Sequence, residues 1–399
     1  MGAAESTTPP ARQPLWPLLA AEPFRLFFPW ALLLGLAGVM LWPLFLAHQL
    51  HFLPAVPHTR LMIMGFGGGC VIGFLGTAAP GLLGARPLGK YDTLWLFVLH
   101  AAAVGSCAML HDEMGCALFA ATLIVLLMML ARRFITRTDM PPPGFVMVLA
   151  GLLCGIAGAI MFALNLDFKN AFCFRFTRLL MNEAFLLLPV LGVSGFLVTR
   201  ILELPSRQTF PESRMPVADW WYIAGEALLA TALLITTFTV EATGEIRMGA
   251  GMRFCLIMGW WLRDMPGLWR AKTLGTQAWM LRVGLGFIAA APLLLTIDPR
   301  KLIALEHVLF ITGFGITILA VATRVVYGHS GSLDQVRQVS KPLRWITWLA
   351  ILAMSTRVSA DYRVSIQNSH YFYAAFTWAI ISLIWLRSVW SKLRTSDPS

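Results

Sequence analysis

The sequence predicts an all-α, polytopic integral membrane protein with about twelve transmembrane helices. Of the 399 residues, 58% are hydrophobic and 13% are charged, against about 25% charged residues in a typical soluble domain. The apolar residues form long runs, and about 20 consecutive apolar residues of helix cross a hydrocarbon core. A soluble core could not bury this much apolar surface under so little polar cover. The lipid bilayer is therefore the expected partner of the chain.

Apolar runs between charged or proline-rich breaks define the expected spans. The tight turn at His111-Asp112-Glu113 makes the third and fourth spans an antiparallel hairpin. The first run is too long for the core of a cleavable signal peptide, so none is expected. The expected spans are 24–46, 61–84, 93–111, 114–131, 145–164, 179–199, 219–240, 248–262, 275–296, 302–323, 343–358 and 371–388. They form one membrane domain over 23–390, between a disordered N-terminus (1–22) and a short tail (391–399).

The distribution of basic residues predicts the orientation. The N-terminus, the even-numbered loops and the C-terminus carry 20 Lys and Arg residues, the odd-numbered loops carry 9, and two lie inside helices, which accounts for the 31 in the chain. Cytoplasmic loops carry the excess of positive charge. Both termini are therefore expected in the cytoplasm.

Several classes of function are disfavoured. The net charge of +11 comes from basic residues that punctuate hydrophobic runs, whereas a nucleic-acid interface needs them clustered on one folded surface, so no nucleic-acid partner is expected. The six cysteines show no C-x-x-C spacing, which argues against a zinc, iron–sulfur or disulfide framework. No nucleophile–base arrangement and no phosphate-binding loop points to hydrolytic or nucleotide-driven chemistry.

The histidines favour one side of the predicted membrane domain. Six of the eight are expected at or near the outer face, His100 lies nearer the middle and His329 lies at the inner end. The six are His48, His51, His58, His111, His307 and His370. A cofactor site near the outer leaflet would account for this pattern, and so would chance.

Three stretches carry a resemblance to a known family. They are EPFRLFFPWALL from Glu22, PHTRLMIMGF from Pro57 with GFLGTAAPGLLG from Gly73, and HVLFITGFGITILAVATRVVYGHSG from His307. They resemble motifs of the NnrS family, haem- and copper-containing membrane proteins associated with denitrification and the nitric oxide response. The late block is the most specific, because its two histidines, its arginine and its glycines fall at fixed spacing.

The resemblance implies a cofactor site. It implies that His58 and His307 bind haem or copper near the outer face, and that a small gaseous or redox ligand reaches the metal. It also points to His329 and Arg324 as cofactor-binding residues, with His329 as a metal ligand. Because His329 follows His307 by 22 residues, a continuous helix separates them by roughly 33 Å, so His329 belongs to a second, inner site or caps its helix. Arg324 could contact a lipid headgroup, a porphyrin propionate or an anion. The family also implies a bacterial inner membrane.

The chain departs from the family pattern beside His58. Arg60 and Leu61 stand where the family's second-helix motif has a second His and a Glu, and Ser330 and Ser332 replace Thr and Arg in the late block. Arg60 is expected to be an interfacial anchor that extends to lipid headgroups. Met62 and Met64 are the methionines that could act as soft metal ligands.

A cofactor-free transporter or channel is the alternative function. Gly65, Gly69 and Gly73 recur on one helix face that lets a neighbouring backbone approach closely. Charged residues inside membrane helices are costly and need partners. Glu226 and Arg282 are expected to pair, whereas Glu183 and Arg253 are expected at outer ends within reach of water. In this alternative all four would line a water-filled cavity.

Overall fold

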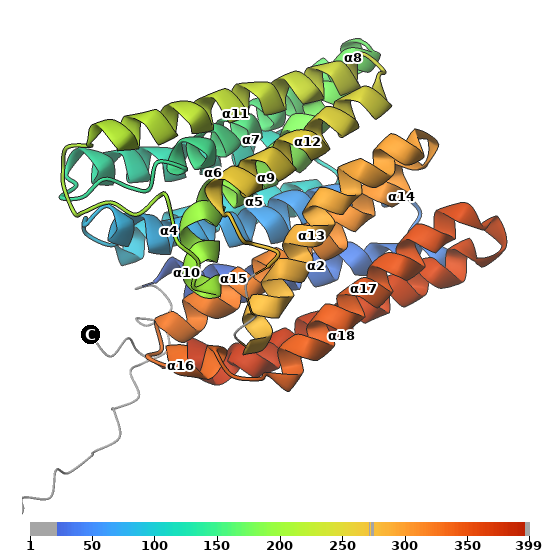
Figure 1. Cartoon of the computed structure of the whole chain (residues 1–399). Coiled ribbons are helices and arrows are strands. Elements are labelled where there is room, and N and C mark those ends of the chain that lie inside the picture. Colours follow the sequence, from blue (N-terminus) through green and yellow to red (C-terminus); the bar gives the residue numbers. More distant parts are fainter. Residues whose placement is uncertain (1–21, 271, 273–274, 396–399) are drawn as a thin grey trace, which may run out of the picture.

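The computed structural model describes residues 22–270, 272 and 275–395, and these residues form helices and no strands (Figure 1). The predicted disordered terminus therefore lies outside the described residues, except for Glu22, as do 396–399 of the predicted tail. The long uninterrupted helices are α2 (Pro23–Leu46), α5 (Lys90–Ala108), α6 (Asp112–Ile135), α7 (Phe145–Ala163), α11 (Ala218–Ala242), α12 (Ile246–Asp264), α13 (Gly275–Ile297), α17 (Lys341–Tyr362) and α18 (Gln367–Leu393).

Three further long segments are composite, because a stretch of π-helix interrupts each of them. They are α3 (Ala55–Arg60), η1 (Leu61–Gly68) and α4 (Gly69–Leu82); then α8 (Ala171–Arg178), η3 (Leu179–Ala184), α9 (Phe185–Val193), η4 (Ser194–Val198) and α10 (Thr199–Leu202); then η5 (Pro299–Lys301), α14 (Leu302–His307), η6 (Val308–Phe314) and α15 (Gly315–Gly328). Three short elements lie in the connections: η2 (Leu166–Lys169), α16 (Leu333–Val336) and η7 (Val364–Ile366).

The prediction of a polytopic, all-helical membrane protein is confirmed. Among the described residues, nine helices are long and apolar enough to cross a membrane. The long helices α5, α12 and α17 are not among the nine, and charged residues such as Asp92, Arg253 and Arg357 lie within them. The total of about twelve spans stays a prediction.

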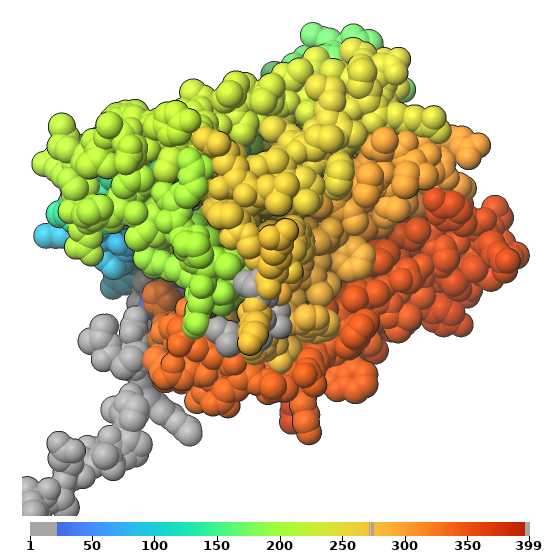
Figure 2. Space-filling view, in the orientation of Figure 1, coloured from blue at the N-terminus to red at the C-terminus, as the bar shows by residue number. Residues whose placement is uncertain are grey.

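The long helices form one bundle that closes on itself. Helices consecutive in the chain pack against each other in most cases, as in α5 with α6, α11 with α12 and α17 with α18. The last helix, α18, also packs against the first, α2. Figure 2 shows α11, α12, α13 and α17 side by side on one face. Large exposed apolar side chains cover the outside of the bundle, as expected where lipid is the solvent; examples are Leu228, Leu229, Trp345, Trp348 and Leu383.

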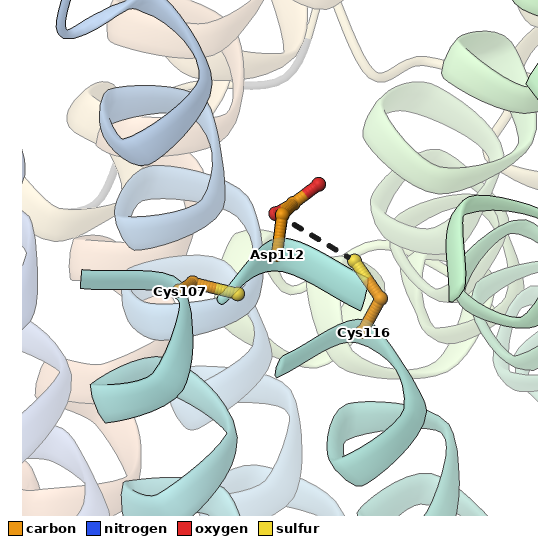
Figure 3. A group of neighbouring side chains, drawn as sticks. All are labelled: Cys107, Asp112 and Cys116. Atoms are coloured by element: carbon orange, nitrogen blue, oxygen red, sulfur yellow. Dashed lines mark hydrogen bonds between the residues drawn. The ribbon is translucent and has the colours of Figure 1, made fainter. Parts of the chain in front are cut away.

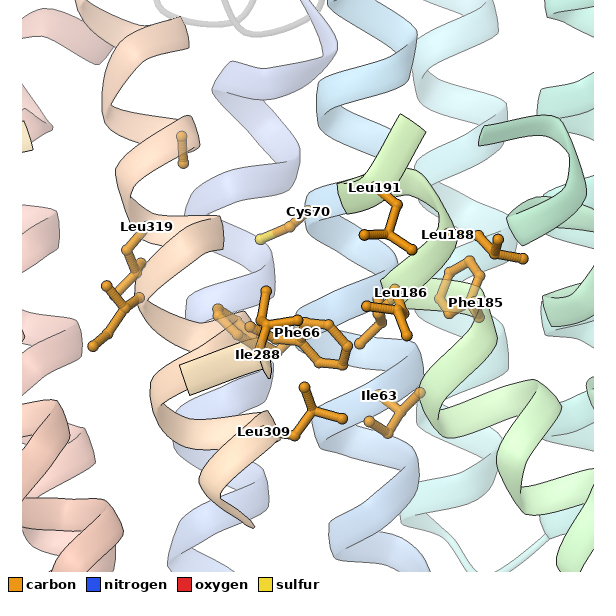
Figure 4. Close-up of a cluster of buried hydrophobic side chains, with 14 of the residues drawn as sticks. Ile63, Phe66, Cys70, Phe185, Leu186, Leu188, Leu191, Ile288, Leu309 and Leu319 are labelled. Carbon is orange, nitrogen blue, oxygen red and sulfur yellow. The ribbon is translucent and has the colours of Figure 1, made fainter. Parts of the chain in front are cut away.

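The composite helices occupy the interior of this bundle. Their spanning windows are 72%, 67% and 67% buried, against 33% to 50% for the other six. Figure 4 shows their apolar side chains meeting, with Ile63, Phe66, Leu186 and Leu309 from three different segments. Glycine permits this close approach: a Cβ on Gly73 would lie 2.9 Å from the Cβ of Phe27 on α2. The glycine face expected on this helix is therefore a packing face.

The structure corrects the predicted pairing of Glu226 with Arg282. Glu226 instead forms ion pairs with Arg207 and Arg263, which lie at the end of the bundle opposite His58. Two buried nitrogens of Arg282, Nε and one Nη, have no hydrogen-bond partner among the described residues. A position along the chain does not say which face of a helix a side chain occupies.

The expected water access at Glu183 and Arg253 is also wrong. Both side chains are buried, and the Arg253 guanidinium lies 3.4 Å from Glu183 and 2.6 Å from Glu241 on α11. A buried guanidinium needs compensating charge, and the structure supplies two carboxylates. The group is an internal ion-pair network that joins three helices.

Candidate functional site: a cavity lined by two histidines

A cavity of about 490 Å³ lies inside one end of the bundle, where the composite helices begin. His58 and His307 both line it, together with arginine side chains and a largely aromatic and aliphatic wall. The arginines are Arg60, Arg178 and Arg357, and the aromatic residues include Trp42, Phe66, Phe162, Phe310, Phe314, Tyr371 and Trp378.

Each composite helix supplies polar residues to the cavity just before its π-helical stretch. His58 and Arg60 precede η1, Arg178 precedes η3, and His307 directly precedes η6. A π-helical turn inserts an extra residue, and such insertions are frequent at functional sites because they rotate the following side chains. The same local device therefore occurs three times around one space.

The imidazoles of His58 and His307 are oriented in the same way. Nδ1 of His58 lies 2.9 Å from the carbonyl oxygen of Gly38, and Nδ1 of His307 lies 2.6 Å from the carbonyl oxygen of Ile303. A carbonyl oxygen can only accept, so each Nδ1 carries the proton and donates. Each Nε2 then holds a lone pair, and the described residues give it no hydrogen bond. A metal-binding histidine has this arrangement, with its second nitrogen fixed by a backbone carbonyl.

The three cavity arginines are each matched by a carboxylate. Arg60 donates two hydrogen bonds of 2.8 Å to Asp112. Arg178 lies 3.0 Å from Glu306, and Arg357 lies 2.9 Å from Asp361. The pairs place guanidinium groups beside the cavity and keep their charge balanced in a setting of low polarity.

The prediction that Arg60 anchors the protein at the lipid interface is wrong. The side chain is buried and points inward to Asp112, and its guanidinium also lies 3.8 Å from the ring centroid of Phe162. The helix begins at Ala55 rather than at Leu61, so Arg60 lies more than a turn inside it. The sequence alone does not reveal the partner of Arg60, because Asp112 lies 52 residues away in a segment that the sequence predicts to be a turn.

Two acceptor oxygens beside the cavity lack a partner. Oδ1 of Asn182 and Oδ1 of Asp167 are buried and accept no hydrogen bond from the described residues. Buried polar atoms are nearly always paired with protein or ordered water. These two oxygens are therefore suited to accept hydrogen bonds from water or from a ligand in the cavity.

His329 and Arg324 do not line the cavity. His329 is the C-cap residue of α15, and its Nδ1 lies 2.7 Å from a carboxylate oxygen of Glu22, which also pairs with Arg25. The helical stretch formed by η6 and α15, from Val308 to Gly328, separates it from His307, in agreement with the expectation that the two histidines cannot share a metal. The side chain of Arg324 forms no hydrogen bond or ion pair within the described part of the chain.

The remaining histidines expected on the outer side do not contribute to the cavity lining. His48, His51 and His111 are exposed in connections between helices, and His370 on α18 shares a hydrogen bond of 2.8 Å with Ser359. Of the six, the structure brings His58 and His307 to one place.

The lining predicted for a transporter is not observed. Glu183, Glu226, Arg253 and Arg282 are absent from the residues that line the cavity. Sequence reasoning missed its polar residues Asp112, Asp167, Arg178, Asn182, Arg357 and Tyr371. A weak signal existed for Arg178 and Arg357, because each is a charged residue near the outer end of an apolar run.

The comparison with protein families decides the classification. The family model described as NnrS protein matches residues 18–396, nearly the whole chain. The chain belongs to the NnrS family. The resemblance expected from the three sequence stretches is thereby confirmed. A search of curated proteins found no match to this NnrS protein.

Proposed function

We propose that this NnrS protein binds haem in the cavity, with His58 and His307 as ligands of the iron. The observation that carries the proposal is that imidazoles about 250 positions apart in the chain line one cavity, and that in both the Nδ1–H is held by a backbone carbonyl. A metal ligand needs the remaining nitrogen unprotonated, and this arrangement supplies it.

The other residues that line the cavity also fit haem. Flat aromatic and aliphatic side chains such as Phe66, Phe310 and Trp378 offer an apolar wall to a flat macrocycle. Guanidinium groups donate to carboxylates in a bidentate manner. Arg60, Arg178 and Arg357 would therefore donate hydrogen bonds to the propionates of haem alongside Asp112, Glu306 and Asp361. When bound, haem would supply an iron that binds small gaseous ligands and exchanges electrons.

Copper is the second cofactor that we propose to test. Met62 lines the cavity beside His58, and thioether and imidazole groups suit copper. Met64 is fully buried and does not line the cavity. Of Met62 and Met64, Met62 is therefore the candidate copper ligand.

We further propose a role in the nitric oxide response or in denitrification, in a bacterial inner membrane with both termini in the cytoplasm. Family membership supports the role, and the bias of Lys and Arg residues supports the orientation. In that orientation the cavity lies near the outer face, and its ligand would be a small gas or a redox partner from that side.

The visible absorption spectrum of the detergent-purified protein tests this proposal. We expect a Soret band that shifts on reduction, and its loss in His58→Ala and in His307→Ala. His370→Ala is the matched control, because His370 lies at the same end of the bundle and outside the cavity lining; it should keep the band. Colourless protein with no iron or copper by elemental analysis would overturn the proposal.

A further inference from the structure

A second group of metal-binding side chains lies behind the Arg60–Asp112 pair. Cys107 at the end of α5 and Asp112 and Cys116 at the start of α6 place one ligand atom each within 4.8 Å of one another (Figure 3). Cys107 and Cys116 are almost fully buried. Asp112 is partly exposed, and it also lines the cavity.

The α5–α6 hairpin holds this group together. Asp112 and Cys116 are four residues apart and so share one face of α6, and the Sγ of Cys116 lies 3.9 Å from Oδ1 of Asp112. Gly115 lets α5 approach this face, because a Cβ at that position would collide with the Sγ of Cys107. The tight turn between the helices requires a positive φ at Leu110.

The spacing of the ligand atoms fits a small tetrahedral ion. With sulfur at about 2.3 Å and oxygen at about 2.1 Å from zinc, neighbouring ligand atoms in a tetrahedron lie roughly 3.6 Å apart. The separation of 3.9 Å between Cys116 and Asp112 is already close to that value. All three ligand atoms lie within 4.8 Å of one another, so a shift of at most about 1 Å in each pair brings them to the tetrahedral spacing.

The charges also balance. Two thiolates and one carboxylate carry three negative charges, and a divalent ion with the Arg60 guanidinium carries three positive ones. Arg60 already donates to both oxygens of Asp112, and each carboxylate oxygen keeps a further lone pair. Outer groups of this kind orient a ligand and tune the site.

We propose that Cys107, Asp112 and Cys116 bind one thiophilic d10 cation, of which Zn²⁺ is the type. Binding forms two metal–sulfur bonds and one metal–oxygen bond, and the two thiol protons leave to solvent. Water completes the coordination. The site lies in the wall of the cavity and is separate from His58 and His307, so it does not depend on haem binding there.

Cadmium titration of the reduced, chelator-treated protein tests the site. Cd²⁺ bound by thiolates gives a sulfur-to-metal charge-transfer band in the ultraviolet. We expect the band to saturate at one equivalent with release of two protons, and excess Zn²⁺ to remove it. Cys107→Ser and Cys116→Ser should each weaken binding roughly tenfold or more, whereas Cys154→Ser and Cys255→Ser, which change cysteines outside the group, should leave it unchanged.

Asp112→Asn provides a variant that keeps both sulfurs. We expect the charge-transfer band at saturation to remain and the affinity to fall, which a loss of folding would not produce. No band in the reduced wild-type protein, or equal loss of the band in the two control variants, would overturn the proposal. A Cys107–Cys116 disulfide that resists reduction and excludes Cd²⁺ would also overturn it.

Discussion

His100 and the pair His58 and His307 show two different arrangements of an imidazole inside the bundle. Nδ1 of His100 accepts from the indole nitrogen of Trp30 at 3.2 Å, and its Nε2 lies 2.9 Å from the carbonyl oxygen of Met64. Both nitrogens are occupied, and the side chain is fully buried on α5. His58 and His307 each use one nitrogen only. His58 and His307 are only partly buried. The number of occupied nitrogens therefore distinguishes His100, which is structural, from the two histidines that we propose as ligands.

The largest effect on stability is expected for His100→Ala. The substitution leaves Trp30 Nε1 and the carbonyl of Met64 unpaired and opens a space in the packed interior. These losses should lower the free energy of unfolding by about 3 kcal/mol, measured by thermal unfolding in detergent. The haem content per folded molecule should equal that of the wild-type protein. A stable His100→Ala protein, or one that folds without haem, would contradict the purely structural role of His100.

Arg60→Met should have the next largest effect. It leaves the Asp112 carboxylate unpaired in a largely apolar place, and the expected loss is about 2 kcal/mol, less than for a fully buried pair because water reaches Asp112. The double variant Arg60→Met with Asp112→Leu should recover part of this loss. A double variant no more stable than Arg60→Met would show that the pair is not the cause.

Removal of a cavity histidine should cost little stability in the cofactor-free protein. His58→Ala and His307→Ala each lose one hydrogen bond to a backbone carbonyl, worth about 1 kcal/mol. Thermal unfolding of cofactor-free samples, run beside His100→Ala, gives the ranking directly. A loss as large as that of His100→Ala would mean that these imidazoles are structural as well.

The smallest effect concerns a third use of histidine, at the opposite end of the bundle. Burial by itself raises the pKa of Glu22, but the hydrogen bond from His329 and the charge of Arg25 outweigh it, and the pKa falls below 4.5. The carboxylate therefore contributes stability at neutral pH, and this contribution is lost as the pH falls below about 4.5. Glu22→Gln should reduce the acid sensitivity of the melting temperature. An unchanged pH profile would contradict the pairing.

The fold could largely be predicted from the sequence, because apolar runs of membrane length have few other solutions. The limits of the composite helices could not, since a π-helical turn leaves no mark in the apolar pattern. The helix predicted to begin at residue 61 begins at Ala55. Arg60 therefore lies within the helix and in the interior, and not at the interface. The short run predicted over 343–358 extends over Lys341–Tyr362, because charged residues continue the helix past its apolar part.

The candidate site could be predicted only in part. His58 and His307 were found because both are histidines near one predicted face and both match a family motif. Their surroundings were not found, because the partners come from distant helices: Arg178 and Glu306 are 128 positions apart. Partner choice depends on which face of each helix meets the next, and a single sequence does not contain that information.

The most direct measurement of the central claim is imidazole rescue of the two cavity variants. Purified His58→Ala and His307→Ala are supplied with haem, and the Soret band is recorded before and after free imidazole is added. We predict weak haem binding in both variants and recovery with imidazole, because free imidazole enters the space that the missing side chain left. Full haem binding in either variant without imidazole would contradict the account.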